Sequence, residues 1–530
     1  MQLVAYGAQD VYLTGNPQIT FFKVVYRRHT NFSQETVEHT LSGNPDFGRK
    51  ASVTVTRNGD LATKMYLRVV TQAAGNFGTG KLAGYVKRLG HALLKSVELE
   101  IGGSKIDKQY GVWLDVWYEL SHGTGHERGY SKMVGDVPEL TTLSDSLPEY
   151  TMYIPLQFWF CRNTGLALPL IALQYHEVRV HFDFANASEC VSYTSGASLS
   201  EIKMKDASLL VDYIYLDSEE RRRFAQVGHE YLIEQVQFTG EESARDRTQK
   251  YKLGFNHPCK ELVWAVRNGN FMGKKFLAYG SEGDHLDAVA KELVKARFTS
   301  AGSAVAGAVA YNAGGAAGTD FDANITVDDD GDAALAFNAA ADVGGLFSKI
   351  VSATVLANGT EVVVTSVSHT LTLADVSKPL ADMGADTRVA GGDSALDAGV
   401  VVNQLNNYGV YIDGSCNPVK EALVQLNGHD RFDKQAGDYF NYVQSDQHHT
   451  NTPADGINVY SFALLPEQHQ PSGTANLSRI DNTLLSVWYR DDSAKGGLSF
   501  LNTDNKLYIF GFSYNVLRVM SGMGGLAYSN

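Results

Sequence analysis

Short segments in which hydrophobic and polar residues alternate recur along most of this chain, separated by turn residues. Val97, Leu99 and Ile101 alternate with glutamates, and a period of two is typical of a strand with one buried face. Similar alternation marks the segments 37–41, 53–55, 65–69, 153–160, 178–184 and 209–216. Several short strands with one convincing helix among them predict an all-β sandwich.

One stretch of the sequence is repeated later in the chain. Residues 97–120 read VELEIGGSKIDKQYGVWLDVWYEL, and residues 423–440 read LVQLNGHDRFDKQAGDYF. A shift of 326 positions superimposes the Gly102 turn on Gly428 and the Asp-Lys-Gln triplet 107–109 on its copy. Solenoid arrays repeat every few tens of residues, so similarity at this long period indicates a duplicated domain.

A glycine and an aromatic segment follow the triplet in both copies. The glycines are Gly111 and Gly437, and in the first copy Trp113, Val116 and Trp117 fall at the spacing of an amphipathic helix. Because the triplet recurs at equivalent sites, we interpret it as structural, holding the corner between a strand and this helix.

The strand pattern begins again at His229. Residues 457–465 resemble residues 149–158, with Tyr460 in the place of Tyr153. Further strands are predicted in the segments 232–238, 251–255, 261–266, 484–489 and 507–512. The second half therefore has a strand series comparable to the first, in the same order around the triplet, and two tandem sandwiches are the economical interpretation.

These patterns divide the chain into four parts. Residues 1–32 mix aromatic residues with glycine and proline turns, and we interpret them as an arm lying against a surface. The first sandwich spans residues 33–217, a charged and solvated connector spans 218–228, and the second sandwich spans 229–530. In the arm, a basic cluster at 23–29 is expected to form salt bridges or contacts to a neighbouring chain.

An insertion distinguishes the second sandwich from the first. Residues 281–412 have no counterpart in the first half, and they precede the strand that corresponds to 97–101. A helix is predicted at 286–293. Asn358-Gly359 lies between two β-rich runs and predicts a hairpin. A connection this long with its own secondary structure is expected to project outward from one end of the sandwich.

Composition excludes several classes of protein. The chain of 530 residues has 45 basic and 59 acidic residues and a net charge of −14, which argues against a dedicated nucleic-acid surface. Its four cysteines are scattered without a CxxC pair, which indicates folding in a reducing compartment rather than a disulfide framework. We find no signal peptide at the N-terminus and no apolar stretch long enough to span a bilayer.

Long motifs resemble one virus family. Residues 7–33, GAQDVYLTGNPQITFFKVVYRRHTNFS, are similar to the opening of the major capsid proteins of nucleocytoplasmic large DNA viruses, most closely the chlorovirus and algal-virus type. The resemblance lapses at about 281–412. It is also carried by SVTVTRNGDL (52–61), VELEIGGSKIDKQY (97–110), GLALPLIALQYHEV (165–178), HEYLIEQVQFTG (229–240), QPSGTANLSRIDN (470–482) and NVLRVMSGMGGLAYSN (515–530).

The resemblance implies two tandem eight-stranded jelly rolls and a homotrimer with a pseudo-hexagonal outline that tiles an icosahedral shell. It also implies outward-facing long loops, an arm near the inner face, minor capsid proteins bound from below, and assembly in the host cytoplasm. The insertion is a candidate for contact with the host surface. Relatives of the chlorovirus type are glycosylated on outward loops, and Asn324 and Asn358 are the candidate sites in the insertion.

The sequence contains several groups that resemble parts of catalytic or metal-binding sites. His122, His126 and Glu127 flank two glycines, and His448-His449 stands in a polar loop, so solvated turns are favoured over metal sites. The acidic run 328–332 lacks the glutamate that an EF-hand requires at its twelfth position. The glycines at 522–525 precede no helix, and no GxSxG motif occurs. We therefore predict a structural protein with no cofactor and no catalytic activity.

Three alternatives remain at this level. The first is a minor or variant capsomer such as a spike-bearing paralogue. The second is a carbohydrate-binding surface module, and the third is a metal enzyme of the cupin class. The insertion motivates the first, the binding of sugars by exposed aromatics of β-sandwiches motivates the second, and the paired histidines motivate the third.

Overall fold

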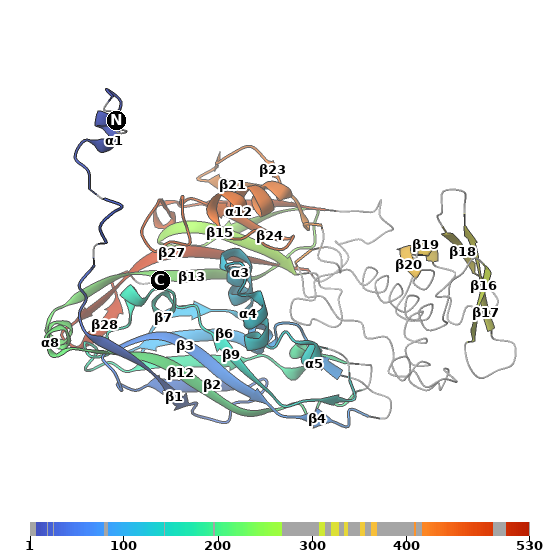
Figure 1. Cartoon of the computed structure of the whole chain (residues 1–530), viewed down its shortest axis with the longest axis horizontal. Coiled ribbons are helices and arrows are strands. Elements are labelled where there is room, and N and C mark those ends of the chain that lie inside the picture. The colour runs from blue at the N-terminus through green and yellow to red at the C-terminus, as the bar shows by residue number, and fades with distance from the viewer. Residues whose placement is uncertain are drawn as a thin grey trace, which may run out of the picture.

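The computed structural model places most of the two predicted sandwiches and the strands of the insertion. It describes residues 7–18, 20–24, 26–78, 83–141, 144–193, 197–267, 307–312, 320–327, 333–337, 350–355, 362–367, 408–409, 416–490 and 505–528. Figure 1 shows one sandwich lying above the other, with the N-terminal arm projecting away from both.

The first sandwich consists of two four-stranded antiparallel sheets. One sheet has the order β1-β12-β3-β9, and the other has the order β2-β10-β6-β7. The strands are β1 (Phe32–Thr40), β2 (Lys50–Val55), β3 (Leu61–Thr71), β6 (Leu94–Ile101), β7 (Ser104–Gln109), β9 (Tyr150–Pro155), β10 (Val178–Phe184) and β12 (Met204–Leu216).

Short elements accompany the strands of the first sandwich. The helix α1 (Asp10–Thr14) lies in the arm and α8 (Ser218–Gln226) follows the last strand. The other helical elements are α2 (Leu89–Leu93), α3 (Gly111–Ser121), α4 (Glu127–Val134), α5 (Pro138–Thr141), α6 (Trp159–Arg162), η1 (Thr164–Leu166) and α7 (Ala187–Cys190). Two small ladders pair β4 (Ala74–Gly75) with β8 (Ser146–Leu147) and β5 (Ala83–Tyr85) with β11 (Val191–Tyr193).

The second sandwich repeats this topology strand for strand. Its sheets have the orders β13-β27-β15-β24 and β14-β26-β21-β22, which confirms the jelly-roll duplication. The elements are β13 (His229–Ser243), β14 (Thr248–Leu253), β15 (Pro258–Arg267), β21 (Val419–Leu426), β22 (His429–Asp430), β23 (Gln435–Ala436), η5 (Tyr439–Val443), α12 (Gln444–His448), β24 (Ile457–Ser461), β25 (Ala475–Asn476), η6 (Leu477–Arg479), β26 (Thr483–Tyr489), β27 (Lys506–Met520) and β28 (Met523–Leu526).

The two copies of the repeated stretch occupy equivalent places in their sandwiches. The predicted shift of 326 positions is wrong by one residue for part of the stretch. In the first copy Val97 pairs with Gln109, and in the second Ala422 pairs with Gln435. Val97 is therefore offset from Ala422 by 325 positions and Gln109 from Gln435 by 326. The two-residue turns 102–103 and 427–428 are equally long, so Gly428 corresponds to Gly103 and not to Gly102 as the sequence predicted. The extra residue of the second copy lies after the turn, between Asp430 and Gln435. Register on a strand has to be read from pairing, since sequence similarity across a turn does not reveal where the extra residue lies.

Tyr153 and Tyr460 are not equivalent, contrary to the sequence prediction. Tyr153 is exposed between the buried Met152 and Ile154, whereas Tyr460 packs against the core of the second sandwich. Successive side chains on a strand point to opposite faces, so an alignment that is wrong by one residue moves a side chain from the core to the surface.

The insertion contains β-structure at five places: β16 (Gly307–Asn312), β17 (Asp320–Val327), β18 (Ala333–Phe337), β19 (Ile350–Val355) and β20 (Val362–Val367). The predicted hairpin is confirmed as an antiparallel pair in which Val355 faces Val362. Its turn at Asn358-Gly359 and the predicted helix at 286–293 lie outside the described residues.

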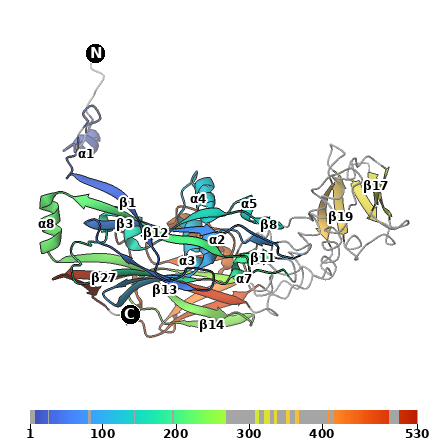
Figure 2. The same cartoon turned by 90° about the horizontal axis from the view of Figure 1, so that it is seen from below.

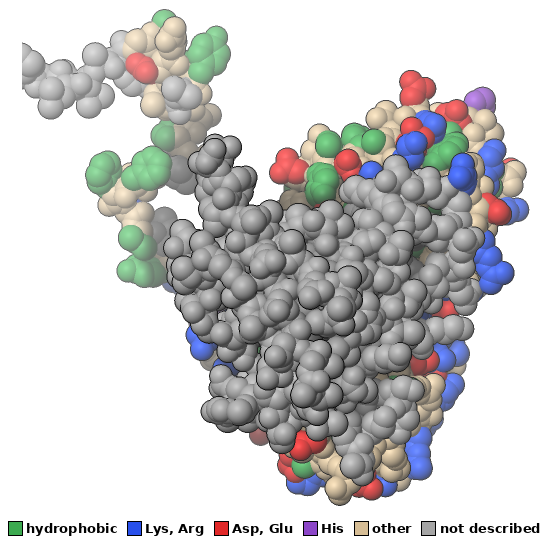
Figure 3. Space-filling model, turned by 90° about the vertical axis from the view of Figure 1, so that its right-hand side faces the viewer, with side chains coloured by type: hydrophobic (Ala, Val, Ile, Leu, Met, Phe, Trp, Pro, Cys, Tyr) green, Lys and Arg blue, Asp and Glu red, His purple; other side chains and the backbone are tan. Residues whose placement is uncertain are grey.

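The N-terminal arm does not lie against its own chain. Tyr12 is 91% exposed and Phe22 is 99% exposed. Figure 2 shows the arm standing clear of the body, and Figure 3 shows hydrophobic side chains on it. The described part of the arm finds no surface on its own chain, and the interpretation of an arm lying against a surface stays a prediction. The predicted connector is the helix α8, in which no residue is buried. No helix in the described part of the chain is long and apolar enough to cross a membrane.

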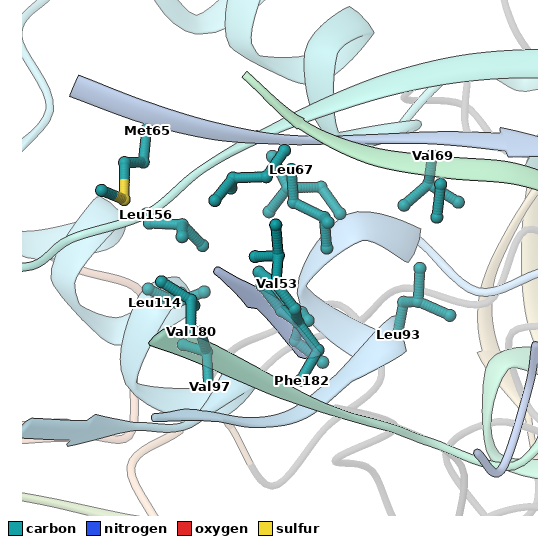
Figure 4. Packing of buried hydrophobic residues seen from close by; sticks show 14 of the residues in the cluster. Val53, Met65, Leu67, Val69, Leu93, Val97, Leu114, Leu156, Val180 and Phe182 are labelled. Carbon is teal, nitrogen blue, oxygen red and sulfur yellow. The ribbon is translucent and has the colours of Figure 1, made fainter. Parts of the chain in front are cut away.

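The core of the first sandwich follows from strand alternation. Val180 and Phe182 on β10 face Met65 and Leu67 on β3 across the space between the sheets (Figure 4), and all four are buried. Leu114 of α3 joins the same cluster. The helix that follows the repeated stretch therefore contributes to the core on one side and leaves its other side for a different contact.

Candidate functional site: the contact between the two sandwiches

The helix α3 joins the two sandwiches through an aromatic cluster. Trp113 and Trp117 project from α3 onto the outer face of sheet β13-β27-β15-β24, where Phe510 and Phe512 lie on β27. The ring of Trp113 is centred 5.3 Å from that of Phe510, and the ring of Trp117 is centred 5.2 Å from that of Phe512. We call this set the junction cluster; its buried members are Trp113, Val116, Trp117, Leu120, Val236, Val263, Ala265, Tyr408, Ile457, Val459, Tyr508, Phe510 and Phe512.

A layer of buried charge borders the junction cluster. The guanidinium of Arg162, from the first sandwich, lies 4.9 Å from the ring centres of both Trp117 and Phe512. It also pairs with Glu234 of the second sandwich at 2.7 Å, and Lys260 pairs with the other oxygen of the same carboxylate at 2.5 Å. Burial lowers the pKa of Lys260. Each oxygen of the buried Glu234 carboxylate therefore has a cationic partner, so this carboxylate is not left unpaired.

The first Asp-Lys-Gln triplet belongs to this contact. The carboxylate of Asp107 accepts hydrogen bonds from the backbone N–H of Val236 at 3.2 Å and from Nε2 of Gln109 at 3.0 Å. Gln235 donates from its side chain to the carbonyl of Ile106. Burial raises the pKa of Asp107 to about 6. The triplet is structural, as predicted. Besides holding the corner between its strand and the following helix, it also joins the two sandwiches.

A second buried network lies beneath α3. Asp115 is fully buried; its Oδ1 lies 2.8 Å from Arg88 and 3.0 Å from His91 Nδ1, and its Oδ2 accepts from the Tyr408 hydroxyl at 2.5 Å. Burial alone would raise the pKa of Asp115, but Arg88 and His91 hold it well below its usual range. Tyr408 falls within the range predicted to project outward, 281–412, yet it is buried in the junction cluster.

His449 occupies a third buried ionic site. Its Nε2 lies 2.9 Å from Glu261 and its Nδ1 lies 3.0 Å from Glu467, and the side chains of His449 and Glu261 are both completely buried. Burial alone would lower the pKa of His449, but the two carboxylates raise it to about 9. The prediction of a solvated polar loop is wrong here, because the partner Glu261 is 188 residues away in the sequence.

Of the candidates around the two glycines, His122 and Glu127 lie 3.8 Å apart. His126 and Glu127 are exposed, but His122 is mostly covered and contacts Asn451 of the second sandwich at 3.2 Å. A solvated turn is therefore wrong for His122 alone. Within the described parts of the chain no three His, Cys, Asp or Glu residues are grouped to hold a metal ion. Gly522 begins a turn before β28, and the acidic run at 328–332 lies outside the described residues.

The sequence analysis did not predict that α3 packs on the outer face of sheet β13-β27-β15-β24. The apolar alternation of β27 continues on both faces, with Leu507 and Ile509 in the core and Tyr508, Phe510 and Phe512 in the junction cluster. A strand that is hydrophobic on both faces is buried on both faces. That pattern at 507–512 was the available signal that another element covers this sheet.

Comparison with known proteins agrees with this architecture. A family model described as "Major capsid protein N-terminus" matches residues 20–217, and one described as "Large eukaryotic DNA virus major capsid protein" matches residues 220–525. The chain is 43% identical to capsid protein 1 of Acanthamoeba polyphaga mimivirus and 44% identical to the major capsid protein of Phaeocystis pouchetii virus. Both comparisons span this whole chain and 99% of the relative.

Solved structures show the same fold. The chain is similar to PBCV-1 VP54, with a TM-score of 0.63 at 32% identity over 96% of this chain and all of that one. The Faustovirus major capsid protein aligns with a TM-score of 0.59 at 12% identity, covering 97% of this chain and 94% of that one. With duplicated jelly rolls, a buried contact that fixes them together and full-length relatives, this chain belongs to the major capsid proteins of large eukaryotic DNA viruses, the structural subunits of the virion shell.

Proposed function

We propose that three copies of this chain form a capsomer with a pseudo-hexagonal outline that tiles the icosahedral shell. The observation that supports this most is the junction itself. Two sandwiches of the same topology are held by an aromatic cluster, by the ion pair of Arg162 with Glu234 and by the hydrogen bond from Tyr408 to Asp115, which makes each chain a stiff two-unit block. A stiff subunit suits a shell, because the orientation fixed at one contact between subunits then also fixes the orientation of the next contact.

The mass and outline of the purified chain test this proposal. We expect light scattering to give three times the 57.8 kDa chain mass and negative-stain images to show hexagonal particles built from six lobes. A monomer or dimer at all accessible concentrations would contradict the proposal.

We further propose that the arm (1–32) and the two sandwiches (33–217 and 229–530, joined by 218–228) have separate roles in assembly. The arm exposes aromatic side chains at Tyr12, Phe21 and Phe22, and such a surface is costly to leave in water. Neighbouring capsomers or minor capsid proteins on the inner face are the partners proposed to cover it, in an assembly that takes place in the host cytoplasm.

Deletion of residues 1–31 tests the role of the arm. Because the described residues of the arm before β1 are almost all exposed, the truncated protein is expected to fold with an unchanged thermal midpoint and to form the same trimers. Assembly of trimers into sheets or shells is expected to be lost, measured by electron microscopy of assembly reactions. Normal assembly of the truncated protein would show that the arm is dispensable.

The remaining proposals concern the insertion and chemistry. We propose that residues 281–412, apart from the buried Tyr408, face outward toward partners on the host surface, and that Asn324 and Asn358 carry glycans. Asn324 lies in β17, and Asn358 lies outside the described residues. We also propose that the protein has no enzymatic activity, in agreement with its place among structural shell proteins.

A further inference from the structure

A pocket of about 380 Å³ lies on the outer face of sheet β2-β10-β6-β7 in the first sandwich. Its volume is at the lower end of the range of small-molecule sites. The lining residues that matter for its chemistry are Lys50, Ser96, Glu98, Lys105, Lys108 and Asp183. The proposed role in the shell makes no use of this pocket.

The duplicated fold supplies a reference for the pocket. Ser96 on β6 pairs with Asp183 on β10, and Glu421 on β21 pairs with Trp488 on β26. The offset of 325 positions between β6 and β21 makes Ser96 the counterpart of Glu421. Asp183 is therefore the counterpart of Trp488, and the same place on the two sheets can be compared side chain by side chain.

In the second sandwich this place is filled. Lys434, the middle residue of the second Asp-Lys-Gln triplet, pairs with Glu421 at 2.7 Å. The same ammonium lies 4.8 Å from the ring centre of Trp488. The second sandwich therefore provides, from its own chain, both a large side chain that covers the sheet and an anion for the lysine of the triplet.

In the first sandwich the same place has shorter side chains, and the lysine lacks its anion. A serine replaces the glutamate and an aspartate replaces the tryptophan. Lys108, the middle residue of the first triplet, lies 5.5 Å from the ring centre of Tyr110 and forms no ion pair with any residue that the structure describes. These exchanges leave an open pocket with an unpaired ammonium at its edge.

The lining also offers hydrogen-bond acceptors. Lys50 pairs with Asp183 at 3.3 Å, and the side chain of Asp183 is 28% exposed. Lys105 pairs with Glu98 at 3.1 Å, and the side chain of Glu98 is 14% exposed. A carboxylate with one ammonium partner keeps lone pairs for further donors. One molecule that carries an anionic group and several hydroxyl groups would therefore satisfy both kinds of lining residue.

We propose that this pocket binds an acidic sugar, meaning a sugar unit that carries a carboxylate or a phosphate. Its anionic group pairs with Lys108, as Glu421 pairs with Lys434 in the second sandwich. Its hydroxyl groups donate hydrogen bonds to Glu98 and Asp183. A bare phosphate ion would offer these two carboxylates almost no donors, and an uncharged sugar would leave the ammonium unpaired. The site lies within one chain, so it does not depend on the proposed trimer.

Ligand-observed NMR with the purified full-length chain tests the site. The acidic probes are glucuronate, glucose 6-phosphate and a tetramer of galacturonate, and glucose is the uncharged reference. We expect saturation transfer to at least one acidic probe and none to glucose. Tighter binding of the tetramer than of glucuronate identifies a saccharide chain as the source of the sugar, and equal or weaker binding identifies a free sugar acid. Transfer to none of the acidic probes, or equal transfer to glucose, overturns the inference.

Substitution of the two corresponding lysines tests which sandwich holds the site. Lys108→Gln removes a charged hydrogen-bond donor, which is expected to weaken binding by about tenfold or more. The matched control is Lys434→Gln, which is expected to leave binding unchanged. Both lysines are exposed, so each variant is expected to fold. Unchanged binding by Lys108→Gln, or an equal loss in both variants, contradicts the assignment.

A double substitution tests whether the pocket itself is the site. Ser96→Glu with Asp183→Trp gives the first sandwich the two side chains of the second, so that a glutamate pairs with Lys108 and a tryptophan fills the space. The second sandwich accepts this combination, and the thermal midpoint is expected to stay near that of the wild type while binding is lost. A folded double variant that binds as the wild type does overturns the inference. If this variant does not fold, the comparison of the two lysine variants decides.

Discussion

Replacing His449 with alanine is expected to destabilise the protein by about 3–5 kcal/mol, because it leaves buried carboxylates without their cation. Glu261 is completely buried and Glu467 is partly buried, and both lie within 3.0 Å of the imidazole. A loss of this size corresponds to a drop in the thermal midpoint on the order of 10 °C for a domain of this size. Differential scanning calorimetry of the purified variant measures it.

The same site predicts a dependence on pH. The folded protein raises the pKa of His449 to about 9, above the value of about 6.5 for an unfolded chain. Stability from the protonated imidazole is therefore fully present below pH 6.5 and is lost as the pH rises through 9. Its size is about 3 kcal/mol. The difference in thermal midpoint between the wild type and His449→Ala is expected to shrink from pH 6 to pH 10.

The adjacent histidine supplies the control. His448 makes a hydrogen bond from its ring to the carbonyl of Leu464 near the surface, so His448→Ala is expected to cost about 1 kcal/mol or less. Equal destabilisation by the two variants, or a His449→Ala effect that is the same at pH 6 and pH 10, would show that ion pairing does not hold this site.

Sequence patterns predicted the parts of the fold that depend on neighbours along the chain. Alternation located the core residues of β6 and β10, and the repeated triplet revealed the duplication, because both signals are contained within a few residues. The spacing of Trp113 and Trp117 also predicted the helix that forms one half of the junction. These two side chains lie on one face of this helix, and its opposite face enters the core.

Sequence patterns failed where a residue's environment comes from a distant strand. His449 reads as part of a polar loop because its partner Glu261 is far away in the chain, and Tyr408 reads as part of the insertion because its partner Asp115 belongs to the first sandwich. The two triplets look alike, yet Asp107 is buried by the second sandwich and Asp433 is exposed. Duplication preserves a local motif, whereas burial depends on which copy has a neighbour.

Gly111→Ala is expected to have the other large effect, with a loss of about 3 kcal/mol or more from forced displacement of a packed backbone. A Cβ at Gly111 would collide with the carbonyl oxygens of His91 and Leu94, and a Cβ at Gly437 would collide with that of Val419. Neither collision involves a flexible side chain that can move away. The corner would have to open, and opening the first corner also pulls Trp113 from the junction cluster.

The duplicated chain offers both a replicate and a control for this prediction. Gly437→Ala is expected to lower the thermal midpoint as Gly111→Ala does, whereas Gly129→Ala, in α4 with open space around its Cβ, is expected to stabilise slightly, by about 0.5–1 kcal/mol, since alanine favours a helix. Soluble yield and calorimetry of the three variants are the measurements. If Gly111→Ala behaves like Gly129→Ala, the close approach of glycine and carbonyl is not what sets the corner; if only Gly111→Ala is severe, the cost comes from the junction and not from the corner.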